Sequence, residues 1–372
     1  MARAPHPVWH AGDRRYATIP RGRAWLAMAL AAVLALVCLT AINSPGPQNQ
    51  PGADQRGPEG QTDLMLYQAI TDHLRAGEPY YQATSAALRQ GGYPLRPFVT
   101  FRLPTLAVLQ ASLPDWGTQA LLRLLIALTA IAWVVRLRPA LTRWPPVALA
   151  AVAMAAGLFV NLQPGLGVFH EMWAGPLVAL SLALRRPGDA TAAIAVGLAA
   201  MLIRETALAY AGVMLILALC DGERREAAGW AVAIAGFGVA LAAHAYAVEQ
   251  VTTALDPASP GWSGLQGIGF FVRLVEISTA LDALPTWAAA IAVAGAIFGW
   301  SAWRDPLAVR ALATIGVYAA TISLFARSDN FYWGLMATPL ILPGLVFLPD
   351  AVRDLYSAAR ERRRMTVHRL AP

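Results

Sequence analysis

Long apolar runs recur along most of the chain and limit the folds open to it. A helix needs roughly 20 apolar residues to cross a bilayer, and runs approaching that length alternate with short polar breaks after residue 116. Hydrophobic residues make up 57% of the chain and charged residues only 14%, whereas a soluble domain carries about a quarter charged residues. The pattern predicts an all-α polytopic membrane protein with about ten transmembrane helices, near residues 24–42, 117–135, 145–161, 169–184, 190–203, 207–220, 227–247, 285–303, 307–325 and 333–349.

The basic residues, all of them arginine, are distributed unevenly around these runs. Most lie before the first run, in alternate breaks and after the last run, and the positive-inside rule marks those segments as cytoplasmic. The first run is too long for a signal-peptide core and has no cleavage site after it, so we expect it to remain as an uncleaved span. The resulting regions are a cytoplasmic basic N-terminus (1–23), a first transmembrane helix (24–42), an extracytoplasmic loop (43–116), a transmembrane bundle (117–349) and a cytoplasmic basic tail (350–372).

The basic charge itself has two interpretations. A pI near 9.8 also occurs in nucleic-acid-binding proteins, but here the arginines flank apolar runs throughout the chain, so we expect the lipid bilayer as partner and no nucleic acid. Arginine without lysine is typical of a GC-rich bacterial genome, which predicts a multi-pass protein of the bacterial inner (plasma) membrane with both termini in the cytoplasm. Cys38 and Cys220 fall at opposite ends of their spans, so no disulfide or cysteine-based metal site is expected.

The loop after the first span is too long to be a simple connection. Residues 43–60 are rich in Pro, Gly and Gln and are typical of a flexible linker. Thr62 then suits a helix N-cap, an apolar stripe at helical spacing follows, and Gly77 predicts the stop. Further short helices are expected over 82–89 and 102–113. Such amphipathic helices would lie in the membrane interface.

Ionisable residues close to a bilayer are costly, by about 2.5–3.5 kcal/mol each on insertion scales. On the predicted topology, a set of charged, histidine and tyrosine side chains nevertheless falls on the same outer side. Their convergence, more than any single residue, predicts a functional site. The candidates are Asp63 and Glu171 for catalysis, with Tyr67, Arg102, His170, Arg204, Glu205, Arg327, Asp329 and Tyr332 for substrate binding.

Each candidate also has a simpler structural explanation. An acid such as Asp63 in the first turn of a helix complements the helix dipole without any catalytic role. Tyr67 suits an aromatic anchor at headgroup level, and residues 327–333 suit a polar loop ending in an aromatic belt. Residues 204–206 suit a hydrated turn between two short spans. His170 and Glu171 are adjacent on a helix and point in different directions, so they are not expected to share a metal without a third ligand.

Sequence motifs for soluble activated substrates are absent from the chain. It has no Gly-x-Gly-x-x-Gly segment after a strand and no Walker sequence, the phosphate-binding motifs of dinucleotide and nucleotide sites. Group transfer by this chain would therefore need an activated substrate that the membrane delivers.

This layout resembles the GT-C superfamily of membrane glycosyltransferases, which take a sugar from a polyprenyl-phosphate carrier at the outer leaflet. The resemblance rests on Asp63-Leu-Met-Leu-Tyr67 after the first span, on Gly77-Glu-Pro-Tyr-Tyr81 with Tyr93-Pro94 downstream, and on His170-Glu171 in the next outer loop. The second of these motifs, Gly77-Glu-Pro-Tyr-Tyr81 with Tyr93-Pro94, resembles the mannosyltransferase-like branch of the superfamily. Asp63 is followed by Leu rather than by a second acid, so a divalent metal stays an open question and no cofactor is identified.

The resemblance implies an inverting hexosyltransferase, with mannose among the candidate sugars and a glycan or lipid as acceptor. Asp63 would be the general base, and Arg327, Arg204 and Arg102, in that order, would offset charge on the leaving phosphate. Three other functions remain open. A flippase or transporter would favour inverted repeats and midplane charges, an O-antigen polymerase or ligase would carry its large loop late in the chain, and a non-catalytic scaffold would tolerate alanine at the charged positions.

Overall fold

The computed structural model describes residues 7–46, 62–163 and 165–360, and in these ranges it contains helices and no β-strand. The predicted linker lies almost wholly outside the described residues. Between the α-helices run several short 3-10 helices, whose bounds are given where they are used. The α-helices are α1 (Arg21–Leu39), α2 (Asp63–Arg75), α3 (Tyr80–Gln90), α4 (Pro104–Ser112), α5 (Asp115–Leu137), α6 (Trp144–Gly157), α7 (Glu171–Leu184), α8 (Thr191–Ile203), α9 (Leu208–Cys220), α10 (Arg224–Glu249), α11 (Gly267–Ile277), α12 (Thr286–Ala302), α13 (Pro306–Phe325), α14 (Thr338–Ile341) and α15 (Leu348–Arg360).

Five helical stretches are long and apolar enough to cross a membrane: Arg21–Asn43, Asp115–Ala140, Arg224–Glu249, Pro306–Phe325 and Phe331–Arg360. Each of the other predicted spans coincides with a shorter apolar helix. At 1.5 Å per residue, α8 and α9 are each only about 20 Å long, less than a hydrocarbon core of about 30 Å. The structure therefore supports a helical membrane protein, and the number of crossings stays a prediction.

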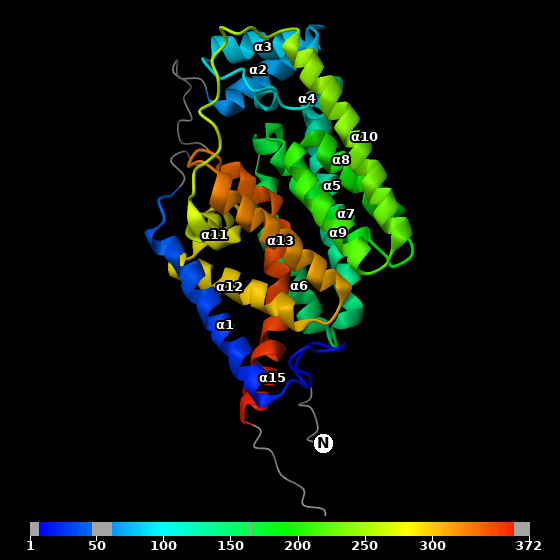
Figure 1. Cartoon of the computed structure of the whole chain (residues 1–372), viewed down its shortest axis with the longest axis vertical. Helices are drawn as coiled ribbons and strands as arrows, with labels where there is room; N and C mark the ends of the chain where they lie inside the picture. Colours follow the sequence, from blue (N-terminus) through cyan, green and yellow to red (C-terminus); the bar gives the residue numbers. More distant parts are fainter. Residues whose placement is uncertain (1–6, 47–61, 164, 361–372) are drawn as a thin grey trace, which may run out of the picture.

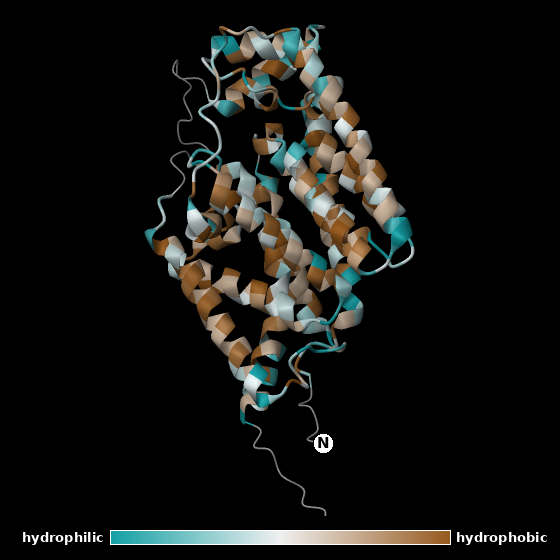
Figure 2. Ribbon diagram, in the orientation of Figure 1, coloured by the Kyte–Doolittle hydropathy of each residue, from teal (hydrophilic) through white to brown (hydrophobic). Residues whose placement is uncertain are grey.

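The helices form an elongated bundle with a separate helical layer at one end (Figure 1). Helices α1, α10 and α13 run in the same direction, while α2, α3 and α4 lie together beside the C-terminal end of α10. Figure 2 shows hydrophobic residues along the bundle helices and more polar ones in the α2–α4 layer and the connections. Leu36 and Val239, on α1 and α10, are 65% and 72% exposed, as expected of side chains that face lipid.

The α2–α4 layer has an apolar core of its own. The Thr62 hydroxyl accepts a hydrogen bond from the Met65 amide at 3.3 Å and begins α2, as the sequence predicts. The buried stripe of α2 then packs against α3, α4 and the end of α10 through a cluster of Leu66, Ile70, Ala87, Leu88, Leu95, Phe101, Ala107 and Val248. Because this core fixes α2, it also fixes the direction of the polar face of that helix.

Helix α11 was not predicted. The glycines at 261–269 were interpreted as turns in an outer loop, and Gly261 and Gly267 do have positive φ values of 89° and 77°. However, α11 begins at Gly267 and buries Phe270, Phe271 and Leu274 in the bundle core. The glycines lower the local helix propensity, and burial of this apolar face compensates for it.

The last apolar run is buried and is not a regular helix. It consists of a 3-10 helix η8 (Phe331–Met336), then α14, then a second 3-10 helix η9 (Leu342–Phe347). Pro339 and Pro343 each lack the amide that a continuous α-helix would need. Gly299 of α12 packs so closely on this segment that a methyl group there would lie 2.0 Å from the carbonyl oxygen of Gly344. Backbone therefore packs directly on backbone at this crossing.

The amino-terminal segment lies against α15, at the opposite end of the bundle from α2–α4 (Figure 1). The amides of Val8, Trp9 and His10 all donate to the carboxylate of Asp350, at 2.5, 2.8 and 2.6 Å. One turn later on α15, Asp354 accepts from the Arg14 guanidinium at 2.6 Å. Burial lowers the pKa of His10 to about 4, so its ring is neutral at physiological pH.

Candidate functional site

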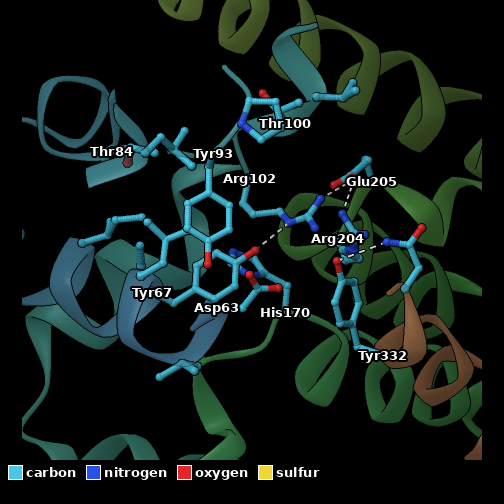
Figure 3. Close-up of a pocket in the computed structure, with 18 of the residues that line it drawn as sticks. Asp63, Tyr67, Thr84, Tyr93, Thr100, Arg102, His170, Arg204, Glu205 and Tyr332 are labelled. Carbon is cyan, nitrogen blue, oxygen red and sulfur yellow. Dashed lines mark hydrogen bonds and ion pairs between the residues drawn. The ribbon is translucent and has the colours of Figure 1, made fainter. Parts of the chain in front are cut away.

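A cavity of about 390 Å³ lies between the α2–α4 layer and the bundle. Figure 3 shows Asp63, Tyr67 and Tyr93 on one side of it and Arg204, Glu205 and Tyr332 on the other, with the Arg102 side chain extending toward Glu205. Of the ten candidate residues from the sequence, all except Glu171 line this cavity: Asp63, Tyr67, Arg102, His170, Arg204, Glu205, Arg327, Asp329 and Tyr332. The expected convergence on one site is therefore present in the structure, and the role of each residue stays a prediction.

Asp63 is the first residue of α2, and this half-buried residue lines the cavity. The carboxylate accepts a hydrogen bond from the Tyr93 hydroxyl. Burial raises the pKa of Asp63, and the Tyr93 hydrogen bond and the charge of Arg102 only partly offset it. In its deprotonated form, a carboxylate with a raised pKa is a stronger base than an ordinary aspartate.

Arg102 lies across the cavity from Asp63, on the segment that leads into α4. Its Nε donates to the hydroxyl of Tyr67 at 3.1 Å, and its Nη1 lies 3.5 Å from the carboxylate of Glu205. The Tyr80 hydroxyl donates to the backbone carbonyl of Arg102 at 2.6 Å. Both the guanidinium and the backbone of Arg102 are therefore held in place, with the side chain 16% exposed to the cavity.

Arg204 lies at the C-terminal end of α8 and is only 1% exposed, so it does not belong to a hydrated turn, whereas Glu205 and Thr206 are partly exposed and line the cavity. Its Nη1 contacts Glu205, and its Nε lies 2.5 Å from Glu171 Oε1, although neither atom of the latter pair makes an aligned hydrogen bond. Glu171 thus lies behind the cavity wall. The geometry gives it contact with Arg204 and no direct contact with the cavity, which argues against the catalytic role expected from the sequence.

The loop between α13 and η8 supplies the remaining charged residues. Arg327 pairs with Asp329 at 2.5 Å, and both side chains are about one-third exposed, at 33% and 37%. Asn330 donates to the Tyr332 hydroxyl at 3.4 Å. Each of the three arginines has a carboxylate beside it, but Arg102 and Arg204 are less exposed than Arg327, and charge interactions are stronger away from water. Arg102 and Arg204 therefore have the stronger claim to bind an anion, which reverses the order expected from the sequence.

His170 is buried, with its ring centroid 5.4 Å from that of Tyr67 in an edge-on contact. Within the described residues, no group of three His, Cys, Asp or Glu side chains is arranged to hold a metal ion. The carboxylate set around Asp63 therefore does not fit a divalent metal site, and no step is assigned to one.

Several lining residues were missed from the sequence. Tyr93 was noted only within a resemblance motif, and its bond to Asp63 joins residues thirty positions apart on different elements. Ser259 and Trp262 reach the cavity because residues 256–259 lie beside Arg96. The Arg96 Nε donates to the carbonyl of Asp256 at 2.9 Å, and the Ser259 amide donates to the Arg96 carbonyl at 2.7 Å. No local sequence pattern indicates contacts between residues so far apart in the chain.

A second cavity, of about 340 Å³ and almost wholly apolar, adjoins the first. It runs between α9, α13 and η8 and shares Glu205, Thr206 and Trp333 with the polar cavity. The Thr206 hydroxyl and the Trp333 indole nitrogen are both buried, and within the described residues neither has a hydrogen-bond partner. Two unused hydrogen-bond donors therefore lie where the apolar cavity meets the charged one.

Comparison of the chain with protein-family models, with curated proteins and with solved structures finds no match. Geometry and charge at the cavity therefore carry the inference of function.

Proposed function

We propose that the chain is a GT-C-type membrane glycosyltransferase that moves a hexose from a polyprenyl-phosphate donor to an acceptor hydroxyl. The reaction would take place at the extracytoplasmic face of a bacterial inner membrane, with both termini in the cytoplasm. The observation that carries the proposal is a carboxylate with a raised pKa, Asp63, which shares one cavity with two guanidinium groups, the partly exposed Arg102 and the buried Arg204.

The chemistry requires a base and a site for negative charge. Asp63 takes the proton of the acceptor hydroxyl as the acceptor oxygen bonds to the anomeric carbon of the donor. The bond from that carbon to the phosphate oxygen breaks at the same time, and the lipid phosphate leaves with the electron pair. Direct displacement inverts the anomeric centre. Arg102 and Arg204 stabilise the charge that grows on the departing phosphate.

The apolar cavity supports a lipid-linked donor in particular. An isoprenoid chain could occupy the space between α9, α13 and η8 while its phosphate lies at the junction with the charged cavity. Thr206 and Trp333 offer unused donors to phosphate oxygens at that junction. A water-soluble sugar nucleotide has no lipid chain to occupy such a groove.

The test is transfer by the purified full-length chain in lipid nanodiscs, with radiolabelled polyprenyl-phosphate mannose as donor and neutral mono- and oligosaccharides as acceptors. The rate of polyprenyl-phosphate release is compared for the wild type, Asp63→Asn and the exposed control Asp282→Asn. We expect Asp63→Asn to lose about 10²–10⁴-fold in rate, as loss of a general base does, and Asp282→Asn to match the wild type. Wild-type turnover by Asp63→Asn removes the proposed base. A wild type that turns over no polyprenyl-phosphate hexose overturns the enzyme assignment, and movement of labelled lipid between leaflets instead would favour a flippase.

A further inference from the structure

A third cavity, of about 190 Å³, is lined in part by α2 and shares no residue with the apolar cavity. Polar side chains from α2, α4 and the first turns of α5 form most of its wall, with the backbone of Gly165 and Gly167 opposite. It shares Thr71, Gln110 and Val168 with the cavity that contains Asp63. The two cavities therefore meet at a common wall.

The lining of this third cavity suits neutral hydroxyl groups. Gln68 and Gln119 contribute amides, which both donate and accept hydrogen bonds, whereas the Gln110 amide already donates to the carbonyl of Gly167 at 2.7 Å. The Thr118 hydroxyl oxygen is buried and, within the described residues, has no hydrogen-bond partner. An unused buried hydroxyl beside several amides is a lining that sugar hydroxyls could satisfy.

The charge of the cavity disfavours anionic ligands. Its one cation, Arg75, lies 2.6 Å from Asp115 and 3.5 Å from Asp72, and it also donates to the carbonyls of Gln110 and Leu113, each at 3.2 Å. Two carboxylates therefore lie beside one guanidinium, and its Nη2 already donates to three oxygens. A uronate or phosphate would meet excess negative charge there.

The distance between the third cavity and Asp63 sets the length of a ligand that reaches both. Thr71, in the shared wall, follows Asp63 by eight residues on α2, which at 1.5 Å per residue is about 12 Å along the helix. Asp63, Tyr67 and Thr71 fall on one side of that helix, since each follows the last by four residues. One monosaccharide cannot bridge such a distance, whereas a saccharide of two or more units can.

We propose that this third cavity binds a non-reacting unit of a neutral oligosaccharide acceptor, whose terminal hydroxyl then lies at Asp63. The inference rests on the proposed glycosyltransferase function and deepens it, because it names the acceptor class. Acceptors of two or more neutral sugars are then preferred over monosaccharides and over acidic sugars.

Binding is measured by saturation-transfer difference NMR on the full-length protein in nanodiscs, without any donor. The probes are methyl α-mannopyranoside, α-1,6-mannobiose and galacturonic acid. We expect the wild type to bind the mannobiose best and the uronic acid least. Gln68→Ala and Thr118→Val should each weaken mannobiose binding about fivefold, the effect of one lost hydrogen bond, while leaving the monosaccharide unchanged.

Gln82→Ala, a matched change at an exposed position of α3, is the control and should bind mannobiose as the wild type does. Equal binding of mono- and disaccharide, strong binding of the uronic acid, or no effect of Gln68→Ala and Thr118→Val overturns the acceptor cavity even when sugar transfer is observed. Binding as expected without any transfer from a polyprenyl-phosphate donor overturns the proposed function alone.

Discussion

The buried charges behind the cavity predict an asymmetric response to mutation. Arg204 and Glu171 are 1% and 3% exposed and in contact, whereas Glu205 is 23% exposed and retains Arg102 at 3.5 Å. Arg204→Met leaves Glu171 without the cation that contacts it, and an uncompensated buried charge costs about 3–5 kcal/mol of folding free energy. Glu171→Gln leaves Arg204 with Glu205, so the loss should be about 1.5–3 kcal/mol, the value of a bond to a charged group.

The free energy of unfolding can be followed in detergent through the reactivity of buried Cys38 with a maleimide dye, in a Cys220→Ser background that removes the exposed thiol. We expect Arg204→Met to be the less stable single variant and the double variant to lose less than the sum of the two. Glu78→Gln, in a surface pair with His73, should change stability by less than about 1 kcal/mol. Equal losses for both single variants, or an additive double variant, would refute a shielded ion pair.

Two further predictions follow from the contacts described above. Tyr93→Phe removes the hydrogen bond that lowers the pKa of Asp63, so that pKa rises further and the acidic limb of the pH–rate profile moves to higher pH; an unmoved limb contradicts Asp63 as the titrating base. Gly175→Ala places a methyl group 2.2 Å from the carbonyl oxygen of Leu335 and should destabilise the fold by about 1–3 kcal/mol or more in the Cys38 assay. Gly212→Ala, with no atom within 4 Å of the added methyl, should be neutral or stabilising, and equal losses at both glycines would contradict this packing.

Features encoded locally could be predicted from the sequence. Thr62 caps α2, and the apolar stripe that follows it packs inward, because both signals act over one or two helical turns. Helices also occur at the other two predicted positions in the long loop, with α3 beginning at Tyr80 and α4 at Pro104. The charged candidates converge because alternate connections of a helical bundle emerge at the same end.

Features that depend on distant partners could not be predicted. Whether Glu171 faces the cavity or Arg204 is decided by the rotation of α7 in the bundle, and the apolar run around it carries little periodicity to set that rotation. The bond between Tyr93 and Asp63 depends on the packing of α2 against α3, and the helix α11 depends on burial of its aromatic face. Pro339 and Pro343 indicate a helix break in the sequence. The prediction of a single span at 333–349 considered only the apolar composition of the run and therefore missed this break.

The docking of the amino-terminal segment on Asp350 has a consequence for biogenesis. Val8 lies 342 residues before its acceptor, so that contact cannot form until the ribosome has made nearly the whole described chain. The segment must therefore stay undocked while the earlier helices insert, and its capture by α15 is among the last events of assembly. The hydrogen bonds from these three amides to Asp350 therefore form only when the bundle is complete.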